Sequence, residues 1–178
     1  MIKYIAFIRG INVGGKNKLK MAELREHLSS IGFINLQSYI QSGNLIFEYP
    51  TKLTHIEIET ILENEIKSKF EIDTRVIVRT HKQLVEYVNM IPYSSEFPPE
   101  QFFLCILKNN VREIKNNPFD KPGKEDDEFR IFDDVVYLRI PFKSYLSKLS
   151  NNFFEKILKS PATTRNWRTI NKLITMSE

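Results

Sequence analysis

The first half of the chain opens with a strand pattern followed by a helix pattern. Residues 2–9 carry apolar side chains on both faces, which predicts a strand that is covered on both sides. A helix follows, indicated by apolar residues at the spacing of one helical face: Met21, Leu24, Leu28 and Ile31. Gly32 stands directly after this stripe, where a glycine commonly ends a helix.

The next fifty residues predict a hairpin, a second helix and a closing strand. Segments 35–40 and 45–49 are rich in strand formers and are joined by the polar turn 41–44. Residues 54–57, Thr-His-Ile-Glu, form a capping box that starts the second helix. Segment 72–79 reads as the fourth strand. This β-α-β-β-α-β order is that of ferredoxin-like folds.

The second half repeats a similar order without a visible sequence repeat. A capping box at 80–83 begins another helix, and a proline-containing stretch over 91–100 follows it. The remaining expected elements are a strand at 102–108, a short helix near 111–116, hairpin strands at 128–132 and 135–140, and helices at 150–159 and 164–176. We therefore expect an α+β protein: a ferredoxin-like subdomain over 1–80, a helix and linker over 81–100, and a smaller α/β subdomain over 101–178 packed with the first.

Composition narrows the class of protein. The chain has 178 residues, of which 42% are hydrophobic and 27% charged, with a net charge of +4, as in ordinary globular proteins. No apolar run approaches the ~20 residues that span a bilayer, and the N-terminus lacks the features of a signal peptide. Cys105 is the single cysteine, which excludes an intrachain disulfide and suits a cytoplasmic protein. It lies in an apolar run, so we expect a buried, inert thiol.

Two segments are basic and contain no acid: residues 9–20, near the end of the first strand, and residues 156–172. Residues 9–20 contain Arg9, Lys16, Lys18 and Lys20 and no acid. In a split β-α-β unit the first two strands run in the same direction, so this loop and the turn 41–44 share one rim of the sheet. A helix N-terminus at that rim would favour an anion. Surface charge without a ligand is the alternative interpretation.

The sequence does not match known catalytic or phosphate-binding motifs. The loop is not a Walker A motif because Asn17 replaces the hydroxyl that binds Mg²⁺. Its glycine spacing does not fit a dinucleotide fingerprint. Ser42 lacks a nucleophile elbow, and the three histidines have no partners at metal-ligand spacing. We therefore expect no metal site and no cofactor, and the sequence assigns no catalytic residue.

A second candidate segment is Thr163-Thr164-Arg165-Asn166-Trp167. Thr163 or Thr164 is suited to cap the last expected helix. Arg165 would then oppose the helix dipole in the first turn, which favours a nearby anion or carboxylate. The two interpretations are a ligand site and a structural role, in which Trp167 fills the core and Arg165 pairs with an acid of segment 120–134.

The chain resembles a bacterial family, the domain-of-unknown-function family 1697, over nearly its whole length. The resemblance rests on five segments: Phe7-Ile8-Arg9-Gly10-Ile11-Asn12-Val13-Gly14-Gly15-Lys16, Lys20-Met21-Ala22 with Leu24-Arg25, Tyr39-Ile40-Gln41-Ser42-Gly43-Asn44, Val78-Arg79-Thr80, and Thr163-Thr164-Arg165-Asn166-Trp167 with Thr169. The resemblance implies a two-part α/β protein, and it brings no established activity, ligand or catalytic residue.

The leading functional hypothesis is a protein that binds a phosphate-bearing ligand, a nucleotide or a nucleic acid at this rim. Its candidate binding residues are Arg9, Asn12, Gly14, Gly15, Lys16, Gln41, Ser42, Asn44, Thr164, Arg165 and Asn166. Recognition of RNA on the sheet face is disfavoured, because the third strand lacks the first aromatic residue of that motif. The alternatives are a small-molecule enzyme with a cleft between the subdomains, and an interaction module without a small ligand. We expect no membrane partner, and the sequence does not set the oligomeric state.

Overall fold

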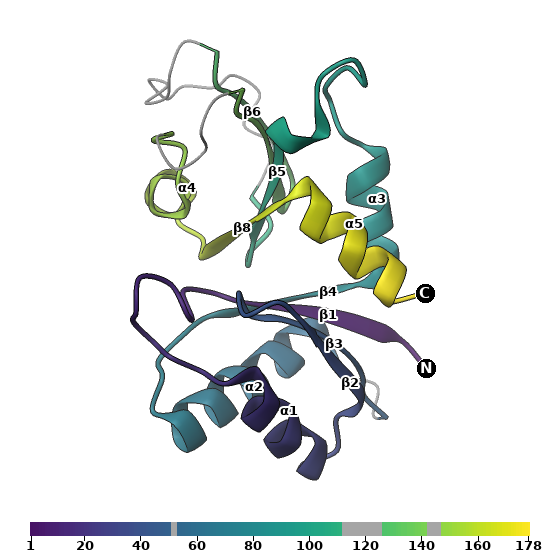
Figure 1. Cartoon of the computed structure of the whole chain (residues 1–178), viewed down its shortest axis with the longest axis vertical. Helices are drawn as coiled ribbons and strands as arrows, with labels where there is room; N and C mark the ends of the chain where they lie inside the picture. The colour runs from purple at the N-terminus through teal and green to yellow at the C-terminus, as the bar shows by residue number, and fades with distance from the viewer. Residues whose placement is uncertain (51–52, 112–125, 142–146) are drawn as a thin grey trace. The chain divides into compact units, whose positions relative to one another are not determined.

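The computed structural model describes residues 1–50, 53–111, 126–141 and 147–178 of the chain. It is an α+β protein with two four-stranded antiparallel sheets (Figure 1). The chain divides into two compact units. The first unit contains Met1–Val85 and Leu173–Glu178, and the second contains Glu86–Lys172.

The first sheet contains β1 (Lys3–Ile8), β2 (Ile34–Tyr39), β3 (Asn44–Glu48) and β4 (Val76–Thr80). Its strand order is β2-β3-β1-β4, and every neighbouring pair is antiparallel. Since β1 and β2 both pair with β3, they run in the same direction and end at the same edge. The prediction that the loop after β1 and the turn after β2 share a rim is therefore confirmed.

Two helices, α1 (Met21–Ser30) and α2 (His55–Phe70), lie on one face of this sheet (Figure 1). They bury their apolar stripes against Tyr4, Ala6, Ile8, Leu45, Phe47, Val76 and Val78. The predicted capping box is present at the start of α2, where the Thr54 hydroxyl accepts from the Glu57 amide. The other strand face is buried as well, as expected for β1: Ile5 and Phe7 are fully inaccessible to solvent.

Carboxylates of α2 protect the edge strand β4. The Val78 amide donates to Glu59 Oε1 at 2.8 Å, and the Val76 amide donates to Glu63 Oε1 at 2.8 Å. Without such cover, the unpaired backbone amides of an edge strand can pair with a strand of another molecule. Glu59 also lies 3.9 Å from the guanidinium of Arg79, and both side chains are buried.

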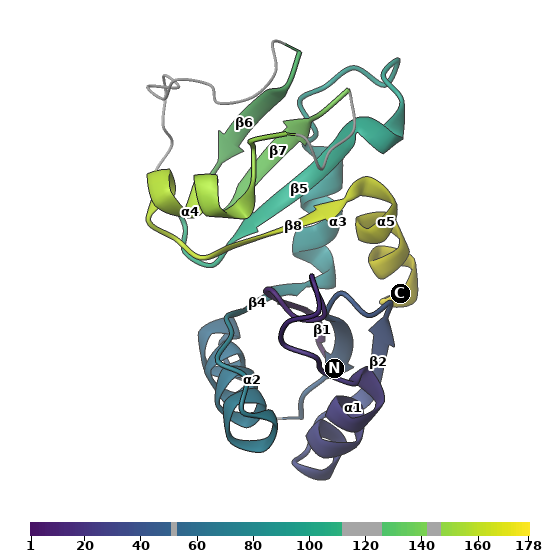
Figure 2. The ribbon, with the colours of Figure 1, turned by 60° about the vertical axis from the view of Figure 1, so that its left-hand side comes forward.

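The second sheet contains β5 (Phe102–Leu107), β6 (Glu128–Phe132), β7 (Val135–Arg139) and β8 (Ala162–Asn166). Figure 2 shows these strands in the order β6-β7-β5-β8, again with antiparallel neighbours. The helix α4 (Asn151–Leu158) packs Phe154 and Leu158 against this sheet. The chain also forms α3 (His81–Asn89) after β4, a short 3₁₀ turn, η1 (Pro99–Gln101), before β5, and α5 (Trp167–Met176) after β8.

The two sheets have the same topology and the same register. In β1 and β3 Phe7 faces Asn44, and in β5 and β7 Ile106 faces Val135. One residue later, the Ile8 amide donates to Gly43 O and the Leu107 amide donates to Asp134 O, each at 2.8 Å. The similar order of elements in the two halves of the sequence thus corresponds to the same strand order and pairing in the two sheets.

The last predicted helix is present but starts later than expected, and the strand before it was not predicted. The helix expected over 164–176 begins at Trp167, because Ala162–Asn166 pairs with β5 as an edge strand. Asn166 caps this helix instead of Thr163 or Thr164, and its Oδ1 accepts from the Thr169 amide at 2.8 Å. The helix expected near 111–116 lies almost wholly outside the described residues.

Candidate functional site

The loop after β1 is a folded structure organised by Asn12. The Asn12 side-chain amide donates to Leu19 O at 2.9 Å and to Gln41 O at 2.8 Å, while its oxygen accepts from the Leu19 amide at 2.8 Å. Asn12 has a φ of 54°, in the left-handed region that asparagine tolerates well. Ile11 and Leu19 are buried at the base of the loop. Asn12 therefore holds the rim together, and its amide groups are engaged by the chain itself.

The tip of the loop is a tight hairpin. Lys16 donates its amide to Val13 O at 3.1 Å, and the two residues form a β-bridge. Gly14 and Gly15 between them have φ values of 58° and 77°, the left-handed conformations that a two-residue hairpin turn requires. No atom lies within 4 Å of a Cβ built on either glycine, so both positions are open to solvent.

The loop and the β2–β3 turn are in direct contact. A Cβ built on Gly43 would lie 2.9 Å from Ile11 Cδ1, which shows how closely the two segments approach. Within the turn, the Asn44 amide donates to Tyr39 O and to Ser42 Oγ, each at 3.0 Å. Asn44 is fully buried, Ser42 is half-buried and Gln41 is exposed. The structure thus brings the sequence-predicted residues of the first unit together at one rim.

The cations of this rim differ in their surroundings. Lys16 and Lys18 are exposed, and neither side chain makes an ion pair or hydrogen bond within the described parts of the chain. Lys20, in contrast, donates to Glu23 at 2.7 Å, and this bond raises the pKa of Lys20. Lys20 also occupies the N-cap position of α1 without a side-chain capping bond. Arg9 is half-buried, and its backbone is fixed on both sides by Thr74 and Arg75.

The other predicted residues, Thr164, Arg165 and Asn166, lie in β8 of the second unit. Thr164 donates its hydroxyl to Asn151 Oδ1 at 2.6 Å, and Arg165 donates to Thr163 Oγ1 at 2.8 Å and to Thr164 O at 3.0 Å. Burial lowers the pKa of Arg165 to about 10, so the guanidinium stays charged at neutral pH. A joint site formed by these residues and the rim of the first unit stays a prediction.

The groups that resemble catalytic pairs have structural roles. His81 Nδ1 lies 2.8 Å from Ser177 Oγ, but Ser177 is buried and its hydroxyl also contacts the carbonyls of Leu173 and Ile174. His27 lies 2.7 Å from Glu65 and joins α1 to α2. Cys105 is buried as predicted, and burial raises the pKa of its thiol to about 12.

Within the part of the chain that the structure describes, no group of three or more histidine, cysteine, aspartate or glutamate side chains is placed to hold a metal ion. Among the same residues, no helix combines the length and the apolar character needed to cross a membrane.

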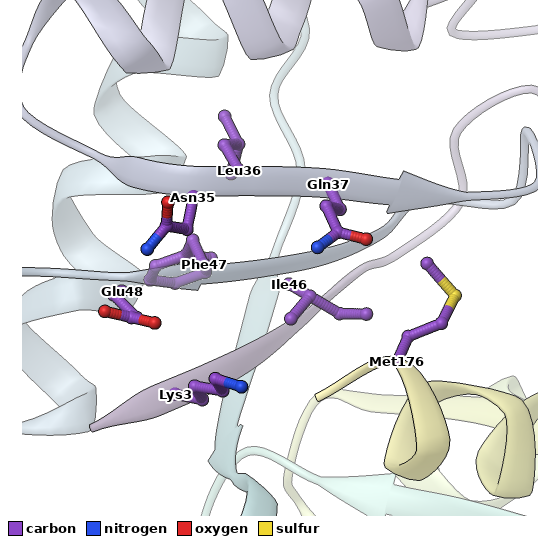
Figure 3. A pocket seen from close by; sticks show the side chains of 8 residues that line it. All are labelled: Lys3, Asn35, Leu36, Gln37, Ile46, Phe47, Glu48 and Met176. Atoms are coloured by element: carbon purple, nitrogen blue, oxygen red, sulfur yellow. The ribbon is translucent and has the colours of Figure 1, made fainter. Parts of the chain in front are cut away.

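Sequence reasoning missed two cavities. One lies on the first sheet, between Lys3, Glu48 and Met176, and has a volume of about 410 Å³ (Figure 3). The other lies in the second unit beside Phe103 and Trp167, with a volume of about 850 Å³. Lys3 and Glu48 are 45 positions apart, and only the strand register reveals that their backbones lie opposite each other.

The fold and the rim define an α+β protein with two sheets of equal topology and a basic, glycine-tipped loop. The family model described as "Protein of unknown function (DUF1697)" matches residues 1–137, and the chain belongs to this family. Curated proteins yield no match. Among solved structures, the conserved bacterial protein SP0830 from Streptococcus pneumoniae is similar, with a TM-score of 0.69, 21% identity and 99% of each chain covered. At this identity the similarity extends to the fold alone.

Proposed function

We propose that the protein binds the phosphate backbone of a nucleic acid through the basic rim of its first unit. The observation that carries the proposal is the pair Lys16 and Lys18, which are exposed, lie in an acid-free loop and have no side-chain partner among the described residues. Lysine contacts to phosphates supply most of the affinity of non-specific nucleic-acid binding, because they release condensed counterions. Gly14 and Gly15 add accessible backbone between these cations.

The shape of the rim favours an extended polyanion over a small nucleotide. Small ligands usually occupy concave sites, whereas the tip of this loop is a hairpin whose two glycines are open to solvent. A hairpin tip with exposed lysines suits the surface of a nucleic-acid backbone. Val13 and Ile40 are exposed apolar residues of the same rim, at 64% and 51% exposure, and offer contacts to sugars.

The internal bonds of the loop support the same function. Asn12, Ile11 and Leu19 hold the loop, so the fold itself sets the backbone positions of its lysines. A preorganised site loses less conformational entropy on binding. We also propose that the first unit is ferredoxin-like, on the basis of its element and strand order, and that the protein works in the cytoplasm, where a single reduced cysteine is expected.

The experiment is a fluorescence-anisotropy titration of the full chain with labelled single-stranded and duplex oligonucleotides at low salt. The double variant Lys16→Ala/Lys18→Ala is expected to bind roughly tenfold or more weakly than wild type. The matched control is Lys69→Ala/Lys156→Ala, which removes the same charge from exposed helix positions. Equal affinities of the two double variants would refute binding at the rim.

A further inference from the structure

The cavity on the first sheet lies at the opposite end of the strands from the basic rim. Lys3 starts β1 and Glu48 ends β3, whereas the rim follows Ile8 and precedes Asn44. Ile46 and Glu48 lie on the sheet face opposite the one on which Phe47 packs against the helices. Figure 3 shows the residues that line the cavity. Among them are Lys3, Asn35, Gln37, Ile46, Glu48 and Met176.

The Glu48 carboxylate is the unusual group in this cavity. Glu48 is only 8% exposed, yet its side chain makes no hydrogen bond or ion pair with any residue that the structure describes. The carboxylate lines the cavity, and a carboxylate there can accept charge-assisted hydrogen bonds from a bound ligand. A ligand that brings a cationic donor to Glu48 would supply such a bond.

Lys3 lies directly opposite Glu48 in the β1–β3 register, but it does not neutralise the carboxylate. Residues at such positions have neighbouring Cβ atoms, and oppositely charged pairs there commonly form ion pairs. Figure 3 shows the Lys3 ammonium directed away from the Glu48 carboxylate and toward Ile46. The cavity therefore presents one positive and one negative group, separated on the same wall.

In the second sheet, side chains of the chain itself fill the equivalent position. Glu48, which lies between Ile34 and Lys3 on the neighbouring strands, corresponds to Arg139, which lies between Glu128 and Phe102. There Arg139 Nε donates to Glu128 at 2.9 Å, and Phe97 covers the guanidinium at 4.2 Å. In the first sheet the partner position holds Ile34, whose apolar side chain cannot form an ion pair with Glu48.

The remaining walls combine amide and apolar groups. A β-bulge between Ile34 and Gln37 interrupts the register of the edge strand β2, and Asn35 within it has a φ of 53°. Bulges commonly re-aim a side chain beside a functional site. Ile46 and the flexible thioether of Met176 supply the apolar surface.

We propose that this cavity binds a small zwitterion with an apolar substituent, of the α-amino-acid class. Glu48 accepts from the ligand ammonium, Lys3 and the amides of Asn35 and Gln37 donate to the ligand carboxylate, and Ile46 and Met176 contact its side chain. The volume of about 410 Å³ lies in the range of small-molecule sites. This inference is independent of nucleic-acid binding at the rim, because the two sites share no residue.

The test is isothermal titration of the full chain with leucine, methionine and phenylalanine at millimolar concentrations. Two analogues of leucine each lack one charge: 3-methylbutylamine has no carboxylate, and 4-methylpentanoate has no ammonium. The zwitterion is expected to bind about tenfold or more tightly than either analogue, since each lost charge-assisted hydrogen bond weakens binding by this order. Binding of an analogue as tight as that of leucine, or no heat with any amino acid, would overturn the proposal.

Variants locate the site. Glu48→Gln is expected to weaken amino-acid binding about tenfold or more, while its thermal midpoint stays close to that of wild type, because no described residue hydrogen-bonds or ion-pairs with this carboxylate. Lys3→Met tests the other charge without touching the acid. Glu26→Gln, at an exposed position of α1, is the matched control and binds as wild type. The Lys16→Ala/Lys18→Ala variant also keeps amino-acid binding, which separates this site from the rim. Wild-type binding by both Glu48→Gln and Lys3→Met would contradict the assignment.

Discussion

Arg79 and Arg165 occupy the same position in the two sheets of the protein. Arg79 faces Ile5 in the β4–β1 pair, and Arg165 faces Leu104 in the β8–β5 pair. Each guanidinium donates through Nη1 to the carbonyl of the preceding residue, at 2.7 Å for Arg79 and 3.0 Å for Arg165. In both sheets the next residue but one begins a helix. The repeat therefore extends from the strand order to individual side chains.

The buried pair of Arg79 and Glu59 gives a first prediction about stability. Arg79→Ala removes a buried guanidinium that lies 3.9 Å from the Glu59 carboxylate, and breaking such a buried ion pair costs about 3–5 kcal/mol of unfolding free energy. Arg75→Ala is the control, because Arg75 is half exposed and its contacts with Asp73 and Glu63 are 3.5 and 4.0 Å long. Surface pairs contribute about 0–1 kcal/mol. Urea denaturation measures both variants, and equal losses would contradict the prediction.

Two glycine substitutions test the contact between the loop and the turn. Gly43→Ala combines a φ of 78° with a Cβ 2.9 Å from Ile11 Cδ1, so backbone strain and overpacking together cost about 2–4 kcal/mol. Gly14→Ala has a φ of 58° and open space, so it costs only about 1–2 kcal/mol. The difference in denaturation midpoint between these variants reports the close approach of the two segments. Equal midpoints would show that the turn is free of Ile11.

Asn12 is predicted to hold the rim through both halves of its side-chain amide. Asn12→Asp keeps the acceptor for the Leu19 amide but replaces the donor to Leu19 O and Gln41 O with an oxygen. We expect a loss of about 1–3 kcal/mol, since two carbonyls then face a carboxylate. Hydrogen exchange of the loop amides should accelerate in this variant. Unchanged exchange would mean that the buried residues alone fix the loop.

Cys105 gives a prediction about reactivity and pH. Burial raises the pKa of its thiol from 9.0 to about 12, so the native thiol stays protonated at pH 8 and reacts with a disulfide reagent only after unfolding. The unfolded chain ionises first, so the contribution of this thiol to stability is complete below pH 9 and is lost as the pH rises toward 12. The measurement is the labelling rate with and without urea. Rapid stoichiometric labelling of the native protein would contradict a buried thiol.

Local signals in the sequence explain why most elements were predictable. The capping box of Thr54 and Glu57 and the helical spacing of Met21, Leu24 and Leu28 act within a few residues, and the structure contains both. The edge strand Ala162–Asn166 was missed because it has no alternation of apolar and polar residues, and its pairing with β5 comes from residues about 60 positions away. The pairing of Lys3 with Glu48 was missed for the same reason, because the two residues lie opposite each other only once the sheet has formed.

The site was predictable in its location and less so in its chemistry. Strand direction alone placed the loop and the turn at one rim. The sequence could not show that Asn12 and Asn44 use their amides on the chain itself, whereas Lys16 and Lys18 remain exposed. Which side chains hydrogen-bond to the chain depends on backbone conformations such as the φ of 54° at Asn12. No sequence motif predicts that conformation.

The most direct test of nucleic-acid binding at the rim is the salt dependence of oligonucleotide affinity. The logarithm of the association constant is plotted against the logarithm of salt concentration for wild type and for Lys16→Ala/Lys18→Ala. Each phosphate contact contributes about 0.7–0.9 to the slope, so removing two is expected to reduce it by about 1.5. A slope that is identical in the two proteins, or the absence of oligonucleotide binding by wild type at low salt, would contradict the proposed function.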